Sequence, residues 1–263
     1  MLVFRRSSGS GFSSLYTLAR MATLFGLAGW VGAAPAGAES GSRPQMVITS
    51  FAPFDGNLTN TSRDVAPLLK ARLEKLVPGL DVSLCPLDVL YDRSAEQALQ
   101  CIAAGGARPV WVLSLGEGEC TVAVETQARN RDDAPGADNA GVRRNGQEIT
   151  PGGPEEAEFT LFPASAMRSR LAPADAARVE ISKDMGGFVC NNTAYHLATA
   201  PALSGVPFGF IHVPAHFCGP DASDPDQLAR IIATMVAPEL SGYVRPDWSA
   251  SAMFRDLFRH IPW

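Results

Sequence analysis

The stretch Gly187-Phe188-Val189-Cys190-Asn191-Asn192 marks the point where a loop is expected to become a helix. A helix is predicted over residues 191–199. It is followed by an apolar strand predicted over residues 206–213, which carries a single histidine in Gly209-Phe210-Ile211-His212-Val213-Pro214. Upstream, Val122-Ala123-Val124-Glu125-Thr126 is another apolar strand, interrupted by one carboxylate. Strands that alternate with helices indicate an α/β fold.

The same alternation extends over most of the chain. Apolar, β-branched runs predict strands over residues 46–51, 81–87, 110–115, 122–128 and the end of 174–181. Amphipathic spacing predicts helices over residues 62–76, 94–105 and 227–236, with Ser62 as a cap and Ser94 and Gln97 as a capping box. Residues 130–158 read as one long loop of the kind that is often functional. We therefore expect a single-domain α/β/α sandwich with a mostly parallel, twisted mixed sheet.

The composition excludes several classes of protein. A hydrophobic fraction of 46% in 263 residues is enough for a large core. The net charge of −5 comes with no basic stripe, so a nucleic acid is not an expected partner. No apolar run reaches the roughly 18 residues of a membrane-spanning helix.

The N-terminus has the pattern of an export signal. Arginines at positions 5, 6 and 20 precede the apolar run 21–31, and Ala36-Gly37-Ala38 follows it as a small-x-small cleavage pattern. The expected signal peptide covers residues 1–38, and an uncleaved anchor is the alternative. We expect the mature protein to be periplasmic or secreted, with no stable membrane insertion after cleavage.

The expected domain boundaries follow from these patterns. Residues 39–45 form a polar linker, residues 46–240 the main α/β domain, and residues 241–263 a C-terminal extension with two Trp and two Phe. Whether the chain forms a homo-oligomer is left open.

The chain has five cysteines, an odd number, so pairing of four would leave one thiol free. Cys190 is the candidate for that thiol. Pairing of Cys120 with Cys218 and of Cys85 with Cys101 is favoured among the three possible arrangements. Buried free thiols are the alternative.

Cys190, His212 and Glu125 are candidates for a nucleophile, its base and the orienting acid. A thiol at a helix N-terminus is stabilised as thiolate by the helix dipole, and N–H groups of the same turn could form an oxyanion hole. Each of the three could instead be an ordinary core or surface residue. A metal site of His212, His216 and Cys218 is a weaker alternative, because Val213-Pro214 opposes the helix that such spacing needs.

Aromatic residues lie close to these candidates in the sequence. Phe51 and Phe54 follow the first predicted strand, and Phe188 precedes Cys190 by two positions. Together they could enclose a small, flat, uncharged pocket, although simple core packing is the alternative for each.

Taken together, these residues resemble the pyroglutamyl peptidase I (pyrrolidone-carboxylate peptidase) family of cysteine peptidases, over about residues 46 to 240. The resemblance rests on five ordered blocks. These are Phe51-Ala52-Pro53-Phe54 with Asn60-Thr61-Ser62; Glu125 with Asn130, Asp133 and Asp138-Asn139-Ala140-Gly141; Pro154, Ala157, Phe159 and Pro163; Gly187-Phe188-Val189-Cys190-Asn191; and Gly209-Phe210-Ile211-His212-Val213-Pro214.

The resemblance implies specific roles. Cys190 would be the nucleophile, His212 the general base and acid, and Glu125 the orienting acid. The side chains of Phe51, Phe54, Phe188 and Val189 would bind the pyrrolidone ring. The implied reaction removes an N-terminal pyroglutamyl residue from a peptide, with no metal or organic cofactor.

Two loops depart from the family pattern. Gly116-Glu117-Gly118-Glu119-Cys120 is acidic and lacks the family's arginine, and Ala215-His216-Phe217-Cys218 replaces an aromatic and a later Pro-Glu-Gln. We hypothesise that a Cys120–Cys218 bond replaces the lost arginine contact. The altered loops leave two alternatives open: a thiol hydrolase of another small amide, and a non-catalytic binding protein that kept the fold.

Overall fold

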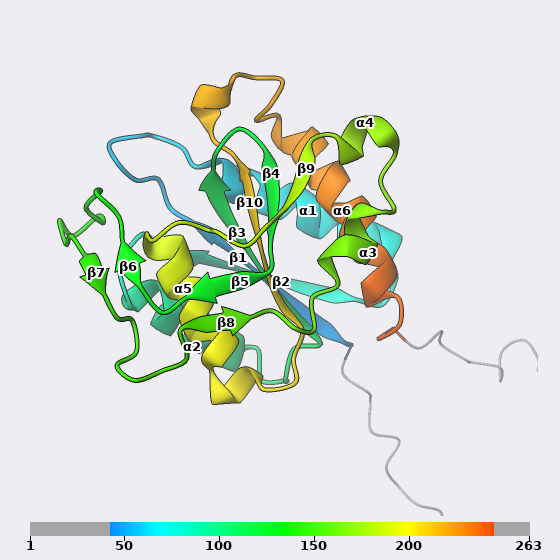
Figure 1. Cartoon of the computed structure of the whole chain (residues 1–263). Helices are drawn as coiled ribbons and strands as arrows, with labels where there is room; N and C mark the ends of the chain where they lie inside the picture. Colours follow the sequence, from blue (N-terminus) through cyan, green and yellow to red (C-terminus); the bar gives the residue numbers. More distant parts are fainter. Residues whose placement is uncertain (1–42, 245–263) are drawn as a thin grey trace, which may run out of the picture. The chain divides into compact units, whose positions relative to one another are not determined.

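A six-stranded sheet with the order β2-β1-β3-β10-β4-β9 runs through the computed structural model, which describes residues 43–244 (Figure 1). Its strands are β1 (Gln45–Phe51), β2 (Asp81–Leu87), β3 (Trp111–Gly118), β4 (Val122–Glu125), β9 (Val179–Ser182) and β10 (Phe208–Pro214). Neighbouring strands pair in parallel, except that β10 and β4 are antiparallel. The predicted mostly parallel mixed sheet is therefore confirmed.

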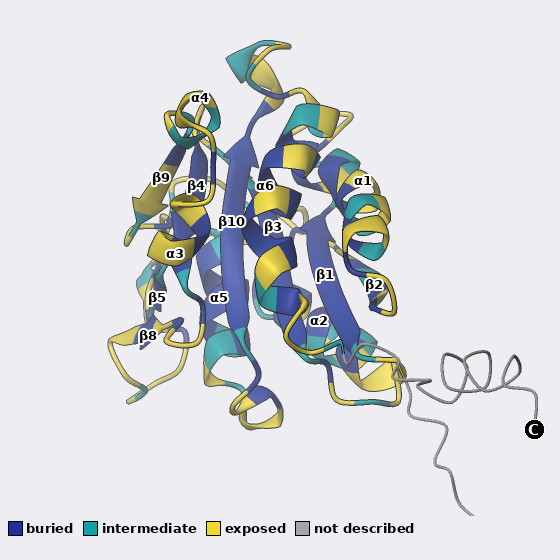
Figure 2. Ribbon diagram, turned by 90° about the vertical axis from the view of Figure 1, so that its right-hand side faces the viewer, coloured by how far each residue is buried: buried dark blue, intermediate teal, exposed yellow. Residues whose placement is uncertain are grey.

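Helices cover both faces of this sheet (Figures 1 and 2). The longer ones are α1 (Thr61–Leu76), α2 (Arg93–Ala104), α5 (Val189–Thr199) and α6 (Pro225–Leu240). Helices α1 and α6 pack together on one face, and α2 and α5 pack together on the other. This arrangement confirms the predicted α/β/α sandwich.

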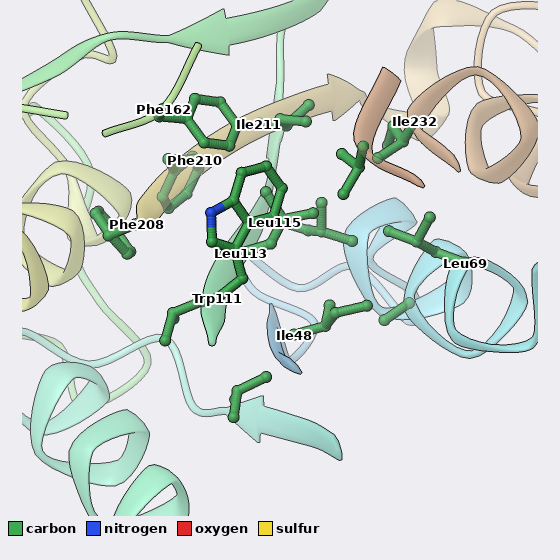
Figure 3. Close-up of a cluster of buried hydrophobic side chains, with 14 of the residues drawn as sticks. Ile48, Leu69, Trp111, Leu113, Leu115, Phe162, Phe208, Phe210, Ile211 and Ile232 are labelled. Carbon is green, nitrogen blue, oxygen red and sulfur yellow. The ribbon is translucent and has the colours of Figure 1, made fainter. Parts of the chain in front are cut away.

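The core lies between the central strands and the helices. Strands β1 and β10 are buried along their whole length, which explains why their sequences are mostly apolar. Figure 3 shows Trp111 of β3 beside Phe162, with Leu69 of α1 and Ile232 of α6 in the same cluster. The Trp111 and Phe162 ring centroids are 5.5 Å apart.

The strand predicted over residues 122–128 is not continuous: it breaks after Glu125, and a second short strand starts at Gln127. The Thr126 N–H and hydroxyl both bind Ser182 O, and the chain then leaves the main sheet. The section predicted as one long loop contains short strands in two small sheets. These elements are β5 (Gln127–Arg129) with β8 (Glu156–Glu158), and β6 (Asp132–Asp133) with β7 (Asn145–Gln147).

Both predicted helix caps differ from the structure. Asn60 caps α1 by accepting a hydrogen bond from the N–H of Ser62, whereas the Ser62 hydroxyl accepts one from the N–H of Phe51 and so ties α1 to β1. Helix α2 begins at Arg93 and has no side-chain cap, so Ser94 lies inside the helix, where its hydroxyl accepts a hydrogen bond from the N–H of Leu90. The remaining short elements are α3 (Ala164–Arg168), α4 (Pro173–Ala176), η1 (Pro201–Leu203) and η2 (His216–Cys218).

The predicted signal peptide over residues 1–38 lies outside the described residues, as do most of the linker and most of the C-terminal extension. The linker was predicted to end at residue 45, where β1 already begins. Within residues 43–244, no helix combines the length and the apolar character needed to cross a membrane.

Candidate active site

Cys190 lies in the first turn of α5, which begins at Val189, slightly earlier than predicted. Phe188 occupies the N-cap position without a side-chain hydrogen bond to the helix. Gly187 precedes it, and a Cβ at this glycine would lie 2.6 Å from the backbone oxygen of Asp133. The thiol therefore stands at the positive end of a helix, on a turn that only glycine allows to pack so closely. It is the free cysteine of the described chain.

His212 and Glu125 meet on the same face of the sheet. In the antiparallel β10–β4 pair, His212 lies opposite Ala123 and Phe210 lies opposite Glu125, so His212 and Glu125 are diagonal neighbours. Nδ1 of His212 is 2.8 Å from Oε1 of Glu125. Because β4 lies between β10 and β9, Glu125 is not on an edge strand, and it is only 1% exposed.

The pKa of His212 depends on both Cys190 and Glu125. Burial by itself would lower the pKa of His212, but hydrogen bonds to Cys190 and Glu125, with the charges on both, outweigh burial and raise the pKa to about 9. The structure thus brings together the sulfur, the imidazole and the carboxylate that the sequence analysis singled out. The imidazole stands between the other two, as a general base or acid requires.

Two glycines of β3 make room for this arrangement. A Cβ at Gly116 would lie 3.0 Å from the Cys190 sulfur and 2.8 Å from the Phe210 ring. A Cβ at Gly118 would lie 2.9 Å from Cβ of His212. Any side chain at these positions would displace the nucleophile or the histidine.

All seven predicted site residues line one pocket with a volume of about 320 Å³. Besides the three polar groups, the lining includes Phe51, Phe54, Phe188 and Val189. The Phe54 and Phe188 ring centroids are 6.0 Å apart. The predicted aromatic enclosure is therefore present, next to the thiol.

The residues that hold the start of α5 were not predicted from the sequence. The Asn191 side chain accepts a hydrogen bond from the N–H of Arg129 and donates to the carbonyls of Arg129 and Arg131. Asn192 accepts from the N–H of Asp92 and donates to Asp132. Two adjacent asparagines directly after a candidate nucleophile were a signal, since buried amides need several partners.

A second missed group lies on the side of the pocket formed by the β3–β4 loop and β9. It includes Glu117 near the end of β3, Glu119 and Thr121 from the loop, and Glu180 and Asp184 from β9 and the turn after it. The acidic loop was noted in the sequence, but the position of β9 next to β4 was not predictable from it.

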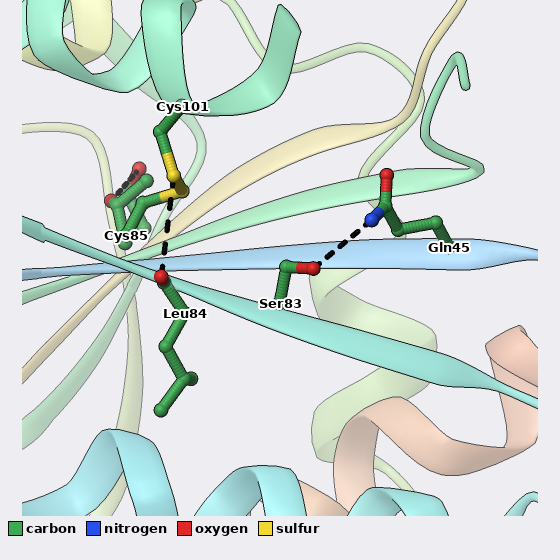
Figure 4. The surroundings of a disulfide bond; sticks show 7 residues. Gln45, Ser83, Leu84, Cys85 and Cys101 are labelled. Carbon is green, nitrogen blue, oxygen red and sulfur yellow. Dashed lines mark hydrogen bonds between the residues drawn. A yellow bond between two sulfur atoms is a disulfide. The ribbon is translucent and has the colours of Figure 1, made fainter. Parts of the chain in front are cut away.

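Two disulfides are present, and both favoured pairings are confirmed. Cys85 on β2 bonds to Cys101 on α2 (Figure 4). Cys120 on the β3–β4 loop bonds to Cys218 in the turn after β10. The alternative metal site of His212, His216 and Cys218 is therefore wrong, since Cys218 is disulfide-bonded. Residues 43–244 contain no cluster of three or more His, Cys, Asp or Glu suited to a metal ion.

Comparison with known proteins assigns the family. The model of the pyroglutamyl peptidase family matches residues 44–224. The chain belongs to the pyroglutamyl peptidase family. Members of this family are cysteine peptidases that remove N-terminal pyroglutamate, which agrees with the resemblance inferred from the sequence blocks.

Individual members of the family are similar over most of their length. The pyrrolidone-carboxylate peptidase of Gloeobacter violaceus is 35% identical over 178 residues, which are 65% of this chain and 81% of that relative. The pyrrolidone-carboxylate peptidase of Pectobacterium carotovorum is 32% identical over 189 residues, 70% of this chain and 81% of the relative. The crystal structure of pyrrolidone carboxyl peptidase from Thermus thermophilus superposes with a TM-score of 0.58 at 27% identity and covers 73% of this chain and 98% of that one.

Proposed function

We propose that this chain hydrolyses the amide bond that follows an N-terminal pyroglutamyl residue, with Cys190, His212 and Glu125 as the catalytic groups. The observation that carries the proposal is the convergence of these three side chains in one aromatic-walled pocket. Membership of the pyroglutamyl peptidase family supports the same substrate class.

The geometry suggests how each group acts. The Cys190 sulfur, as thiolate beside imidazolium, attacks the acyl carbon, and the resulting oxyanion is stabilised by N–H groups at the start of α5. The C–N bond then breaks as His212 gives its proton to the leaving amine, which produces a thioester. Water attacks the thioester while His212 removes its proton, and pyroglutamate leaves with the thiol restored. Glu125 holds the imidazole and stabilises its charged form.

The pocket wall fits the acyl group. A pyrrolidone ring is small, flat and uncharged, so it suits a surface formed by Phe51, Phe54, Phe188 and Val189. This mechanism requires no cofactor, because the three side chains supply the nucleophile, the acid and the base.

The test is an assay of the purified chain, with mild reductant to keep Cys190 reduced, on pyroglutamyl-anilide and on acetyl- and alanyl-anilides. We expect release of aniline from the pyroglutamyl substrate and loss of this activity in Cys190→Ser. Turnover that persists in Cys190→Ser would reject the mechanism. Turnover of another blocked anilide alone would indicate a thiol hydrolase of a different small amide, and no turnover of any would indicate a non-catalytic protein.

We also propose that the chain is exported to the periplasm or secreted. The N-terminal pattern of residues 1–38 supports this, as do the two disulfides, which persist in oxidising compartments. Sequencing the N-terminus of the protein recovered from the producing cells tests it. A start at Glu39 in the periplasmic or culture fraction is expected, and retention of the full chain in the cytoplasm would contradict it.

A further inference from the structure

The wall of the catalytic pocket is strongly acidic. Five carboxylates line it, and no lysine or arginine is among its lining residues. The five are Glu117, Glu119, Glu125, Glu180 and Asp184. Lys183 lies next to Asp184 in the sequence but does not line the pocket.

Three of these carboxylates have partners that compensate their charge. Glu125 faces His212. Glu117 accepts a hydrogen bond from the N–H of Thr61 at the N-terminus of α1, at 2.5 Å. Asp184 forms an ion pair with Arg129, at 2.8 Å.

The other two carboxylates, Glu119 and Glu180, are exposed at the pocket and are not paired with a cation. Glu180 accepts a hydrogen bond from the neutral hydroxyl of Thr121, at 2.7 Å, and Glu119 has no ion-pair partner among residues 43–244. The Cys120–Cys218 disulfide ties down the loop between Glu119 and Thr121, and Glu180 is joined to the same loop by its hydrogen bond with Thr121. We refer to Glu119 and Glu180 as the acidic rim.

The pocket also contains a buried acceptor without a partner. Oε2 of Glu125 makes no hydrogen bond with the residues that the structure describes, although Glu125 is only 1% exposed and lines the pocket. A buried polar atom of this kind favours a ligand that brings hydrogen-bond donors or positive charge. The interior therefore favours a ligand with a hydrogen-bond donor, whereas the unpaired charges of the rim favour a cation.

The register of the sheet fixes where the acidic rim stands relative to the catalytic groups. His212 pairs with Ala123, and Ala123 pairs with Glu180, so the three form one row across β10, β4 and β9, on the same face. Glu180 is then two strand spacings from His212, roughly 10 Å along the sheet. Phe51 is the last residue of β1, which lies in the opposite direction from His212, beyond β3.

A bound substrate would lie along this row. If the pyroglutamyl ring sits among the aromatic residues on the β1 side, the scissile bond lies at Cys190 and His212. The next residue then extends towards β4 and β9. The side chain of a lysine or arginine at that position is long enough to span the distance from the scissile bond to the rim.

We propose that the acidic rim selects pyroglutamyl peptides whose second residue is positively charged. This inference rests on the proposed function and specifies its substrate class. The attraction acts mainly on binding, so it changes KM more than kcat. It weakens as ionic strength rises, because the rim is exposed to solvent.

The experiment compares pyroglutamyl-arginine amide, pyroglutamyl-alanine amide and pyroglutamyl-glutamate amide at low salt, with the released amine measured. We expect kcat/KM to fall in that order, with the arginine substrate favoured over the alanine one by roughly three- to tenfold, as expected for two exposed charge pairs. The preference should shrink in about 0.5 M salt, where the Debye length is only a few ångströms.

Variants identify the residues responsible. Glu119→Gln/Glu180→Gln should bring the arginine-to-alanine ratio close to one, because it removes both charges while glutamine at position 180 can keep the hydrogen bond with Thr121. The matched control Glu156→Gln/Glu158→Gln removes the same charge from exposed positions on β8, outside the pocket, and should preserve the ratio. Glu119→Lys/Glu180→Lys should favour the glutamate substrate.

The outcomes separate this inference from the proposed function. Equal cleavage of all three substrates, or a preference that survives in the rim variants, would overturn the inference and leave the proposed function standing. If the wild-type chain cleaves none of the three, the proposed function itself fails.

Discussion

The imidazole of His212 is buried, and burial alone would make it a weaker base. The hydrogen bonds and charges of Cys190 and Glu125 reverse this effect and raise the pKa of His212 to about 9. The charged imidazolium is therefore the stable form of His212 at neutral pH. A protonated His212 is ready to donate to a leaving amine.

This coupling predicts the pH dependence of the reaction. A raised pKa means that the imidazolium persists at neutral pH and is lost as pH rises through about 9, so kcat/KM should have an alkaline limb near that pH. In Glu125→Gln the imidazolium loses one stabilising charge, so the limb should move to lower pH and the maximum rate should fall by about a hundredfold or more. The measurement is the pH profile of kcat/KM for pyroglutamyl-anilide, with Glu156→Gln as control. An alkaline limb at the same pH in Glu125→Gln would show that the carboxylate does not set this pKa.

At the residue scale, the groups with distinctive chemistry could be predicted from the sequence. A thiol at a loop-to-helix junction, a histidine in an apolar strand and an acid in an apolar strand each stand out from their surroundings. Glu180 does not stand out, because an acidic residue on a short strand is ordinary. Its importance depends on the row that it shares with His212, which only strand order and register reveal.

At the scale of single elements, the end of β3 limits the position of the catalytic histidine. Gly118 lies against the His212 side chain, and Gly116 lies against the Cys190 sulfur. In the sequence alone, this stretch resembles only a glycine-containing loop. The closeness of β3 to both groups follows from the parallel pairing of β3 with β10, in which Gly116 lies opposite His212.

Gly118→Ala should therefore damage catalysis more than folding. The new methyl group would lie 2.9 to 3.2 Å from three atoms of His212, which is held on its other side by Glu125, so the ring must shift. We expect kcat to fall by roughly ten- to a hundredfold, as displacements of about 1 Å do, with a stability loss of about 1–3 kcal/mol. Steady-state kinetics and urea unfolding measure the two effects.

The control for this prediction is Gly242→Ala, just after the end of α6. The nearest atom to a Cβ there is 3.7 Å away, so both kcat and stability should stay close to wild type. Wild-type kcat in Gly118→Ala would mean that β3 does not constrain His212.

The elements themselves were predictable to different degrees. The strands β1 and β10 could be predicted from the sequence, because strands covered on both faces are mostly apolar. The break between β4 and β5 was not, because nothing in Glu125-Thr126-Gln127 marks a turn, and the bend depends on hydrogen bonds from Thr126 to Ser182 on a distant strand.

At the scale of the whole molecule, the two disulfides connect very different places. Cys85–Cys101 ties a strand to the helix that follows it, with a sequence separation of 16. Cys120–Cys218 ties the β3–β4 loop at the pocket to the turn after β10, with a separation of 98. The first therefore stabilises one side of the sandwich, whereas the second also ties down the loop that carries Glu119 of the acidic rim.

Removing each disulfide should separate stability from activity. On chain-entropy grounds, Cys85→Ser/Cys101→Ser should lose about 3 kcal/mol and Cys120→Ser/Cys218→Ser up to about 4–5 kcal/mol. Only the second variant should also lose activity and substrate preference at temperatures where both variants remain folded. Thermal unfolding followed by assays on pyroglutamyl-anilide and the charged dipeptide amides measures this. Unchanged kinetics in Cys120→Ser/Cys218→Ser would contradict a role for this bond at the pocket.

The central claim is that Cys190 becomes acylated during turnover. Its most direct test is to mix the protein with excess pyroglutamyl-anilide, quench in acid within the first turnovers, and map the peptides by mass spectrometry. We expect the peptide that contains Cys190 to gain the mass of one pyroglutamyl group, and the corresponding peptide of Cys190→Ser to show no such gain. Turnover without this adduct, together with hydrolysis that survives in Cys190→Ser, would contradict it.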